Sequence, residues 1–369
     1  MSDDTVHIPV DTLQSFMVDM FIALGVPPDD AGITAEILIT SDLWGIESHG
    51  VGRLKMYYDR LKAGTQEPLT RLQVVRDTPT TAVVDGGLGL GQVIAYRAMR
   101  TAIAKARRHY GLGSVAVRNS GHFGIAGYYP LMATREGMVG LSFTNARPSI
   151  APTFGVEPML GTNPIAFGAP TDEPFPFLFD AATSITQRGK IEVLNRAEKP
   201  TPVGWVINED GSPATDSAQI LQDLTHKRAA LLPLGGAGEE LGGHKGYGLA
   251  TMVEILCAAF QGGCFLSALT DLDPEGKRQP LRLGHFFLAL DVEHFCPLEE
   301  FKHTTGEILR QLRAAKKAPG QERIYTAGEK EYYLAQHVRA VGVPANANLQ
   351  KDLKVIQEEL GLSQYDLGF

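Results

Sequence analysis

The sequence has few cysteines, no long apolar run and no leader-like start. Cys257, Cys264 and Cys296 form no Cys-x-x-Cys pair, which argues against a disulfide framework or a zinc site built from paired cysteines. The most apolar stretch, residues 248–261, contains Glu254 and falls short of the roughly 20 apolar residues of a membrane-spanning helix. The first ten residues are polar and acidic, unlike a secretory signal. These absences predict a cytoplasmic protein without a membrane segment.

Positive charge is also scarce. A protein whose main partner is nucleic acid or an anionic membrane needs clustered Lys and Arg. The formal net charge of -8 therefore argues against both kinds of partner. The sequence contains neither a His-Glu-x-x-His motif nor a cluster of histidines and carboxylates, so nothing in it indicates a catalytic metal. With 44% hydrophobic residues in a chain of 369, one large core or two interlocked cores are expected. The expected partner is therefore a small molecule.

Hydrophobic periodicity predicts helices at both ends of the chain and alternating strands and helices in its middle. Spacings of three and four residues predict the helices, and short apolar runs predict the strands. The expected helices are residues 10–24, 29–43, 53–62 and 93–108 and a further one ending at Arg135; the expected strands are residues 81–85, 114–118 and 139–144. This order indicates an α/β fold with helical terminal parts.

Two glycine-rich loops resemble nucleotide-binding motifs only in part. In residues 86–91, Gly87 and Gly89 are followed by Gln92 where the Rossmann fingerprint has its third glycine, and no acidic residue follows the next strand. This loop either binds an anion or allows a close backbone approach. The second loop carries Lys245 at the start of the most apolar helix. It lacks the Walker spacing, although a lysine there could bind phosphate.

Three side chains recur at helical spacing after Trp44. His49, Arg53 and Tyr57 share one face if a helix begins near Ser48. An arginine can bind a carboxylate through two parallel hydrogen bonds, and a neutral histidine can accept a hydroxyl proton. The alternative is that His49 is an ordinary half-buried histidine and Arg53 a surface cation.

Three more histidines lie near predicted strands. His122 follows a strand in a glycine-bounded loop, where functional groups are common, but a capping or packing role is equally open. His285 and His294 lie among strand-like aromatic residues, and we interpret them as structural.

Five motifs in a fixed order resemble the type-2 malate and L-lactate dehydrogenase family, over nearly the whole chain from Val10 to Leu360. This family also includes sulfolactate, ureidoglycolate and diketogulonate oxidoreductases and a cyclic imino-acid reductase. The motifs are SDLWGIESHG (41–50) with Arg53, GHFG (121–124) with GYY (127–129), GTNP (161–164), DAATS (180–184) and GHKGYG (243–248).

The resemblance implies a mixed-sheet α/β fold that is not a Rossmann fold, and a homodimer. It implies a substrate and dimerisation domain formed by residues 1–118 and 297–369, and a cofactor-binding domain formed by residues 119–296. The implied activity is hydride transfer between NAD or NADP and a small 2-hydroxy or 2-oxo acid, with malate/oxaloacetate first and lactate or sulfolactate next. The alternatives are a reductase of cyclic imino acids and a nucleotide-binding protein without catalytic activity.

Site residues are assigned by the same resemblance. His49 exchanges the proton with Ser48 beside it, or His122 does so, and the sequence does not decide between them. Arg53 binds the substrate carboxylate, with Tyr57 on the same face. The implied cofactor contacts are Ser142, Asn163, Pro164, Asp180, Ala181, Ala182, Thr183, Ser184, His244, Lys245, Gly246, Gly328 and Glu329, and no metal is implied.

Two features bear on the cofactor without fixing it. Residues 235–241, with Glu239 and Glu240, lengthen the approach to Lys245 compared with shorter members of the family. Arg188 and Lys190, just beyond the DAATS motif, either bind the extra phosphate of NADP or form a solvated charge pair.

Overall fold

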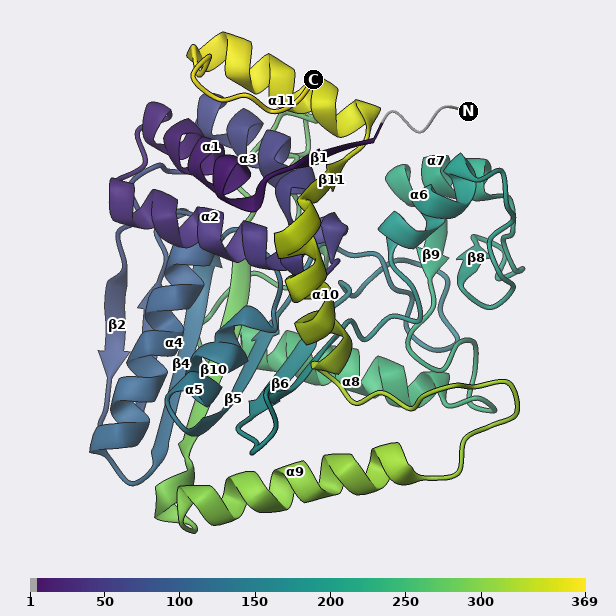
Figure 1. Ribbon diagram of the computed structural model, residues 1–369. Helices are drawn as coiled ribbons and strands as arrows, with labels where there is room; N and C mark the ends of the chain where they lie inside the picture. Colours follow the sequence, from purple (N-terminus) through teal and green to yellow (C-terminus); the bar gives the residue numbers. More distant parts are fainter. Residues whose placement is uncertain (1–4) are drawn as a thin grey trace.

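A seven-stranded mixed sheet forms the centre of the protein (Figure 1), which we describe from a computed structural model covering residues 5–369. The first four residues of the polar start, at which the predicted substrate domain also begins, lie outside the described residues. In spatial order the strands are β2 (Gln73–Asp77), β3 (Thr81–Asp85), β4 (Leu112–Ser120), β10 (Leu283–Asp291), β5 (Met138–Thr144), β6 (Ile165–Ala169) and β7 (Phe177–Ala181).

Only one neighbouring pair in this sheet is parallel. β3 and β4 run parallel and are connected by helix α4 (Gly91–Arg108), whereas β10 is antiparallel to both β4 and β5. A Rossmann sheet is instead mostly parallel, with repeated strand-helix-strand crossovers. The predicted mixed-sheet, non-Rossmann fold is confirmed.

Helices cover both faces of the sheet. α4 and α5 (Tyr128–Arg135) pack on one face, where Phe287 of β10 is fully buried with Val115 and Val117 of β4. α8 (Gly243–Ala258) lies on the other face, where Cys257 contacts the cluster around Phe143 and Phe286. Consecutive residues of a strand point to opposite faces, so β10 contributes to both layers.

The two ends of the chain come together beside the sheet. β1 (Val6–Ile8) pairs with β11 (Val343–Ala345), and the terminal helices share one apolar core. Figure 1 shows most of them stacked above the sheet, while the helix of residues 329–341 runs down from this layer toward the sheet. These helices are α1 (Val10–Ala23), α2 (Pro28–Leu43), α3 (Leu54–Lys62), α10 (Glu329–Val341) and α11 (Ala347–Leu360).

A small lobe and one long helix complete the fold. The lobe contains α6 (Arg188–Arg196), β8 (Val206–Asn208), α7 (Ser217–Thr225) and β9 (Ala229–Leu231) around its own apolar cluster. α9 (Leu298–Ala314) runs along the far end of the sheet from the terminal helices (Figure 1). No helix within residues 5–369 combines the length and apolar character that crossing a membrane requires.

One element departs from the expectation for the N-terminal region. The shared face of His49, Arg53 and Tyr57 was expected only if a helix begins near Ser48, but α3 begins at Leu54, close to the start of the predicted helix 53–62. Residues 47–53 instead form two short 3-10 turns, Glu47–His49 and Val51–Arg53, separated by Gly50. The single helical face for His49, Arg53 and Tyr57 is therefore wrong.

Candidate active site

The turns before α3 are held by a buried carboxylate. Asp42, near the end of α2, accepts a hydrogen bond of 2.8 Å from the backbone N–H of Val51. A Cβ at Gly50 would lie 2.0 Å from the Asp42 Oδ1, so only glycine fits against this carboxylate. Burial raises the pKa of Asp42 well above its usual range. This contact fixes the backbone that presents Ser48 and His49.

His49 lies directly against His122. The two imidazole rings are stacked with 5.4 Å between their centroids and an interplanar angle of 24°. Both side chains are half-buried, and Ser48 Oγ lies 2.8 Å from His49 Nδ1. Residues from two distant loops are thus brought together, although the predicted helical face does not exist.

Tyr57 fixes the protonation pattern of His122. The Tyr57 hydroxyl lies 2.5 Å from His122 Nδ1, and the backbone N–H of Gly124 donates to the same nitrogen at 3.4 Å. An N–H can only donate, so Nδ1 of neutral His122 is the acceptor and Nε2 carries the proton. Burial raises the pKa of Tyr57 far above its usual range, which keeps the phenol protonated as a donor.

Both histidines are held in the neutral form. Burial, followed by the charge of Arg53, lowers the pKa of His49 to about 4. Burial, then His49, Arg53 and Arg60, lowers the pKa of His122 well below its usual range. Two imidazoles that are neutral at pH 7 can serve as a proton acceptor and a hydrogen-bond donor.

Arg53 is anchored and retains free donors. Its Nε donates to the backbone oxygen of Ser48 at 2.6 Å. Among the residues that the structure describes, none accepts a hydrogen bond from its two terminal nitrogens. Those nitrogens are available as a pair for a carboxylate beside the histidines.

The glycine loop at residues 86–91 supports the His122 loop. A Cβ at Gly91 would lie 2.4 Å from the carbonyl oxygens of both Gly121 and His122. Leu88 and Gly86 donate backbone hydrogen bonds to Asn119 and Arg118. Of the two readings of this loop, the structure supports close backbone approach.

Thr183 joins the three loops that the sequence assigns to the cofactor. Its N–H and hydroxyl donate to Thr162 O at 2.9 and 3.1 Å, and its own carbonyl accepts from Leu234 N at 2.8 Å. Asn163, fully buried, donates to Ala250 O at 3.0 Å within α8. Residues 161–164, 180–186 and 234–246 are therefore one connected surface.

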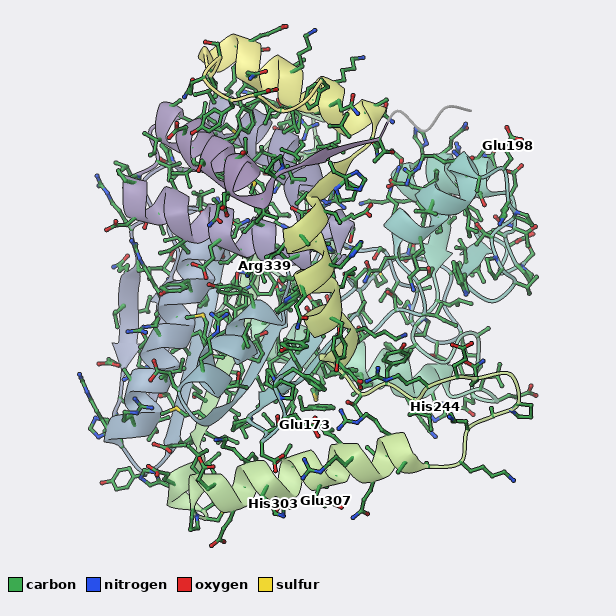
Figure 2. The ribbon with its side chains drawn as sticks, viewed as in Figure 1. Glu173, Glu198, His244, His303, Glu307 and Arg339 are labelled. Carbon is green, nitrogen blue, oxygen red and sulfur yellow. The ribbon has the colours of Figure 1, made fainter. Side chains whose placement is uncertain are left out.

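The start of α8 offers donors to a phosphate. His244 and Lys245 are exposed in its first turn, at the end of α8 nearest the small lobe (Figure 2). A Cβ at Gly243 would lie 2.0 Å from Gly236 O, and one at Gly246 would lie 2.1 Å from Leu234 O, so this entry turn requires glycine. Lys245 and the positive end of the helix favour an anion there.

Buried hydroxyls beside this turn fit a dinucleotide. The side-chain oxygens of Ser184 and Thr186 are buried without a hydrogen-bond partner in the described structure. Ser184 forms a β-bridge with Pro233, directly before the glycine-rich approach to α8. Hydroxyls, a lysine and a helix start together match the polar and charged groups of a nicotinamide dinucleotide.

Asp180 and Ser142 lie beneath the neighbouring loop. Asp180 Oδ2 accepts from Gly127 N at 2.7 Å, and desolvation by the surrounding protein raises the pKa of this carboxyl to about 6. Ser142 is fully buried and donates to Ala126 O at 2.8 Å. Both side chains therefore support residues 126–127, which follow the His122 loop.

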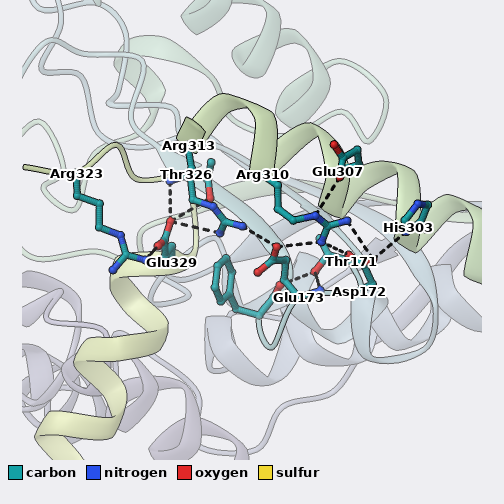
Figure 3. A network of polar contacts seen from close by, with 11 residues as sticks. Thr171, Asp172, Glu173, His303, Glu307, Arg310, Arg313, Arg323, Thr326 and Glu329 are labelled. Carbon is teal, nitrogen blue, oxygen red and sulfur yellow. Dashed lines mark hydrogen bonds and ion pairs between the residues drawn. The ribbon is translucent and has the colours of Figure 1, made fainter. Parts of the chain in front are cut away.

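Glu329 belongs to an ion-pair network, shown in Figure 3. Its carboxylate is fully buried, binds Arg323, and accepts a hydrogen bond of 3.1 Å from Thr326 N. Arg313 on α9 lies 3.7 Å from it and bonds Glu173 at 2.6 Å. The carboxylate of Glu329 is thus occupied within the protein.

Sequence reasoning missed two polar residues next to the histidines. Arg60 follows Tyr57 on α3 by three residues, and Gln66 packs against Gly121. The spacing of three residues between Tyr57 and Arg60 on α3 was the available signal. His285, interpreted as structural, is fully buried, stacks on Phe123 at 4.6 Å, and has its pKa lowered to about 3 by burial.

The fold and site define an α/β enzyme with a paired-histidine, arginine-containing centre beside a glycine-rich, dinucleotide-like surface. The sequence profile of the malate/L-lactate dehydrogenase family matches residues 8–354. The chain belongs to this family. The predicted family, fold class and enzyme class are confirmed.

Similar proteins cover almost the whole chain. It is 44% identical over 362 residues to a malate dehydrogenase from Pyrococcus horikoshii, covering 98% of each chain. It is 38% identical to an L-sulfolactate dehydrogenase from Methanocaldococcus jannaschii, covering 96% of this chain and 97% of the relative. A crystal structure of malate dehydrogenase from Entamoeba histolytica matches with a TM-score of 0.94 and 41% identity, covering 99% of this chain and 100% of the other.

More distant relatives differ in cofactor and substrate. An Escherichia coli ureidoglycolate dehydrogenase named for NAD(+) is 30% identical over 90% of each chain. A (2R)-3-sulfolactate dehydrogenase from Chromohalobacter salexigens named for NADP(+) is 35% identical over 74% of this chain and 77% of its own. These names agree with the prediction of NAD or NADP as cofactor.

Proposed function

We propose that the protein catalyses reversible hydride transfer between NAD(H) or NADP(H) and a short 2-hydroxy or 2-oxo acid, with malate/oxaloacetate as the first candidate and lactate or sulfolactate next. The observation that carries this proposal is the stack of His49 on His122 beside the unpaired terminal nitrogens of Arg53. Malate dehydrogenases among the similar proteins support the choice of malate.

The two histidines have different roles in this proposal. When bound, the nicotinamide supplies or takes up the hydride. His122 points an Nε2–H at the substrate oxygen and orients it, because Nδ1 already accepts from Tyr57 and Gly124. His49 exchanges the proton of that oxygen, since the Ser48 hydroxyl can either donate to or accept from its Nδ1.

We propose that the connected surface of residues 161–164, 180–186 and 234–246 binds the cofactor, with Lys245 near its phosphates. Gly328 and Glu329 would contribute main-chain groups, because the Glu329 carboxylate is occupied. Arg188 bonds Glu192 at 3.1 Å and Thr225 at 3.0 Å, so the solvated-pair reading suits it better than a phosphate contact. Lys190 is exposed beside it, so the proposal covers both NAD and NADP.

A homodimer is the proposed assembly. α8 exposes Leu249, Met252 and Ile255, and a groove of about 540 Å³ lies between this face and Phe265. Contiguous exposed apolar surface of this kind is typical of an interface. The proposed dimer contact therefore involves α8.

The proposed domains divide the site between them. Residues 1–118 and 297–369 supply the substrate side chains His49, Arg53 and Tyr57, and residues 119–296 supply most cofactor loops. The central sheet joins both parts, because β10 pairs with β4. We also retain a cytoplasmic location as a proposal, supported by three cysteines that form no disulfide.

The test is nicotinamide absorbance of the purified protein with each cofactor in turn against oxaloacetate, pyruvate, sulfopyruvate and a cyclic imino acid. We expect the highest kcat/KM with oxaloacetate. Preference for the cyclic imine would favour the reductase alternative, consistent with the 29% identical reductase structure from Pseudomonas syringae. Cofactor binding without turnover of any substrate would favour the non-catalytic alternative.

A further inference from the structure

A small polar cavity adjoins the His122 loop. It has a volume of about 20 Å³. That is room for about one water molecule, which is the size of one oxygen of an acid group. Its walls combine α3, the loop after α3, Gly121 and the loop of residues 271–281, and the lining includes Arg60, Gln66, Asp271 and Arg278.

Arg60 is the unpaired cation of this cavity. Within residues 5–369, no side chain forms a hydrogen bond or close ion pair with its guanidinium. The neighbouring Asp271 is already bound by Arg147 at 3.0 Å and faces Arg278 at 3.8 Å. A half-buried guanidinium without a carboxylate indicates a place for an anion from outside the protein.

Gln66 leaves a second polar group in the same cavity. It is only 4% exposed, and its Oε1 has no hydrogen-bond partner in the described structure. Its Nε2 donates to Gly89 O at 3.3 Å, which orients the amide. A buried amide oxygen without a partner costs free energy unless water or a ligand reaches it. Because this oxygen only accepts hydrogen bonds, it favours a water molecule in the cavity, and Arg60 supplies the donors for an anion.

The cavity stands in a defined relation to the reacting groups. Arg53, Tyr57 and Arg60 follow one another at spacings of four and three residues, so they lie along one side of the segment that leads into and forms α3. Tyr57, between the two arginines, is bonded to His122. Gly121, the residue before His122, lines the cavity beside Arg60. The two guanidinium groups therefore flank the tyrosine–histidine pair.

We propose that Arg60 binds the second acid group of a dianionic 2-oxo acid, a carboxylate or a sulfonate, while Arg53 binds the carboxylate next to the reacting carbon. This inference rests on the proposed dehydrogenase function and makes Arg60 the residue that selects two-acid substrates over one-acid substrates. A monoanionic substrate leaves Arg60 without a partner and forfeits a charge-assisted hydrogen bond.

The test compares the ratio of kcat/KM for oxaloacetate to kcat/KM for pyruvate, with sulfopyruvate as the sulfonate arm. We expect the wild type to favour the two-acid substrates, and Arg60→Gln to lower the ratio roughly 10- to 100-fold, the range for losing a hydrogen bond to a charged group. Arg60→Lys keeps the charge without the two-pronged geometry, so its ratio should lie between the wild-type ratio and the Arg60→Gln ratio.

Arg282→Gln is the matched control. It removes the same charge from an exposed residue directly after the loop of residues 271–281, outside the cavity lining. We expect its ratio to stay within about threefold of the wild type, because an exposed charge acts only weakly. An equal effect of Arg282→Gln and Arg60→Gln would overturn the contact with Arg60 in favour of the overall positive charge of this region.

Two outcomes separate this inference from the proposed function. If the wild type reduces no 2-oxo acid, the proposed function fails. If the wild type reduces oxaloacetate and pyruvate equally well, or if Arg60→Gln reduces both equally, only the role of Arg60 fails. Thermal unfolding with malate or lactate in the presence of cofactor gives a readout without turnover: malate should raise Tm more than lactate in the wild type, and this difference should shrink in Arg60→Lys.

Discussion

Tyr57 and His122, 65 residues apart in the sequence, are joined by a hydrogen bond of 2.5 Å between the phenol oxygen and Nδ1. The contact links α3 of the terminal helical layer to a loop that leaves the central sheet. It sets the tautomer of a histidine that stacks on His49. Helical layer and sheet therefore have to assemble before the site has its chemistry.

Tyr57→Phe tests this link. The ring stays, but without the hydroxyl the Nε2–H tautomer of His122 loses its main support, so we expect kcat to fall roughly tenfold or more while the cofactor Kd changes little. Tyr58→Phe is the control, because that hydroxyl bonds Glu359 instead. Equal loss in both variants, measured by steady-state kinetics and cofactor titration, would argue against the tautomer role.

Arg53→Lys tests the carboxylate site. A lysine is a point charge and cannot reproduce two parallel hydrogen bonds, so kcat/KM for the oxo acid should fall far more than cofactor affinity. Arg107→Lys, at an exposed pair with Glu136, is the control. If Arg53→Lys weakens oxo acid and cofactor to the same extent, Arg53 is not the substrate-carboxylate residue.

His49→Ala tests the proton exchange. We expect turnover to drop roughly 10²- to 10⁴-fold, the range for removing a general acid or base, with the assembly state unchanged by light scattering. A variant that retains nearly normal turnover would move the proton exchange to His122.

The pH profile gives a second readout of His49. Its pKa is lowered to about 4, so the neutral form that accepts a proton persists well below pH 6.5. For hydroxy-acid oxidation, kcat/KM should stay level down to about pH 5 and fall as the pH approaches 4, after correction for substrate ionisation. A fall centred near pH 6.5 would show an ordinary histidine in this role.

Ile255→Asp tests the proposed dimer. The Ile255 side chain is 56% exposed on the apolar face of α8, and a buried, unpaired carboxylate at an interface is unfavourable. We expect the variant to be monomeric by light scattering at concentrations where the wild type is dimeric. Val203→Asp, at a residue 72% exposed in the small lobe, should leave the dimer intact. A wild-type monomer would refute the interface directly.

Glu329→Gln separates structure from cofactor binding. Removing the buried carboxylate takes the shared anion from Arg323, which is 47% exposed, and from Arg313, which keeps Glu173, so unfolding free energy should fall by about 1–3 kcal/mol. Cofactor Kd should change less than about threefold if only main-chain groups of this turn contact it. Glu307→Gln, a 46% exposed partner of Arg310, is the control for denaturant unfolding. A large loss of cofactor affinity with normal stability would show that the Glu329 carboxylate contacts the cofactor.

The order of motifs and the periodicity of apolar residues were sufficient for the family, the α/β class and most helices. These signals are local: spacings of three and four residues predict a helix such as α4, and the incomplete glycine fingerprint already argued against a Rossmann site. The spacing of His49, Arg53 and Tyr57 left open whether a helix begins near Ser48, and the buried carboxylate of Asp42 selects tight turns there instead.

The tertiary structure decided what no local pattern contains. The tautomer of His122 depends on a tyrosine from another layer, the low pKa of His49 depends on burial, and the unpaired state of Arg60 depends on Asp271 being occupied by other arginines. Each is a property of groups distant in sequence that share one low-dielectric site. The sequence determined which chemical groups are present, and the packing determined which of them remain available to bind a ligand or exchange a proton.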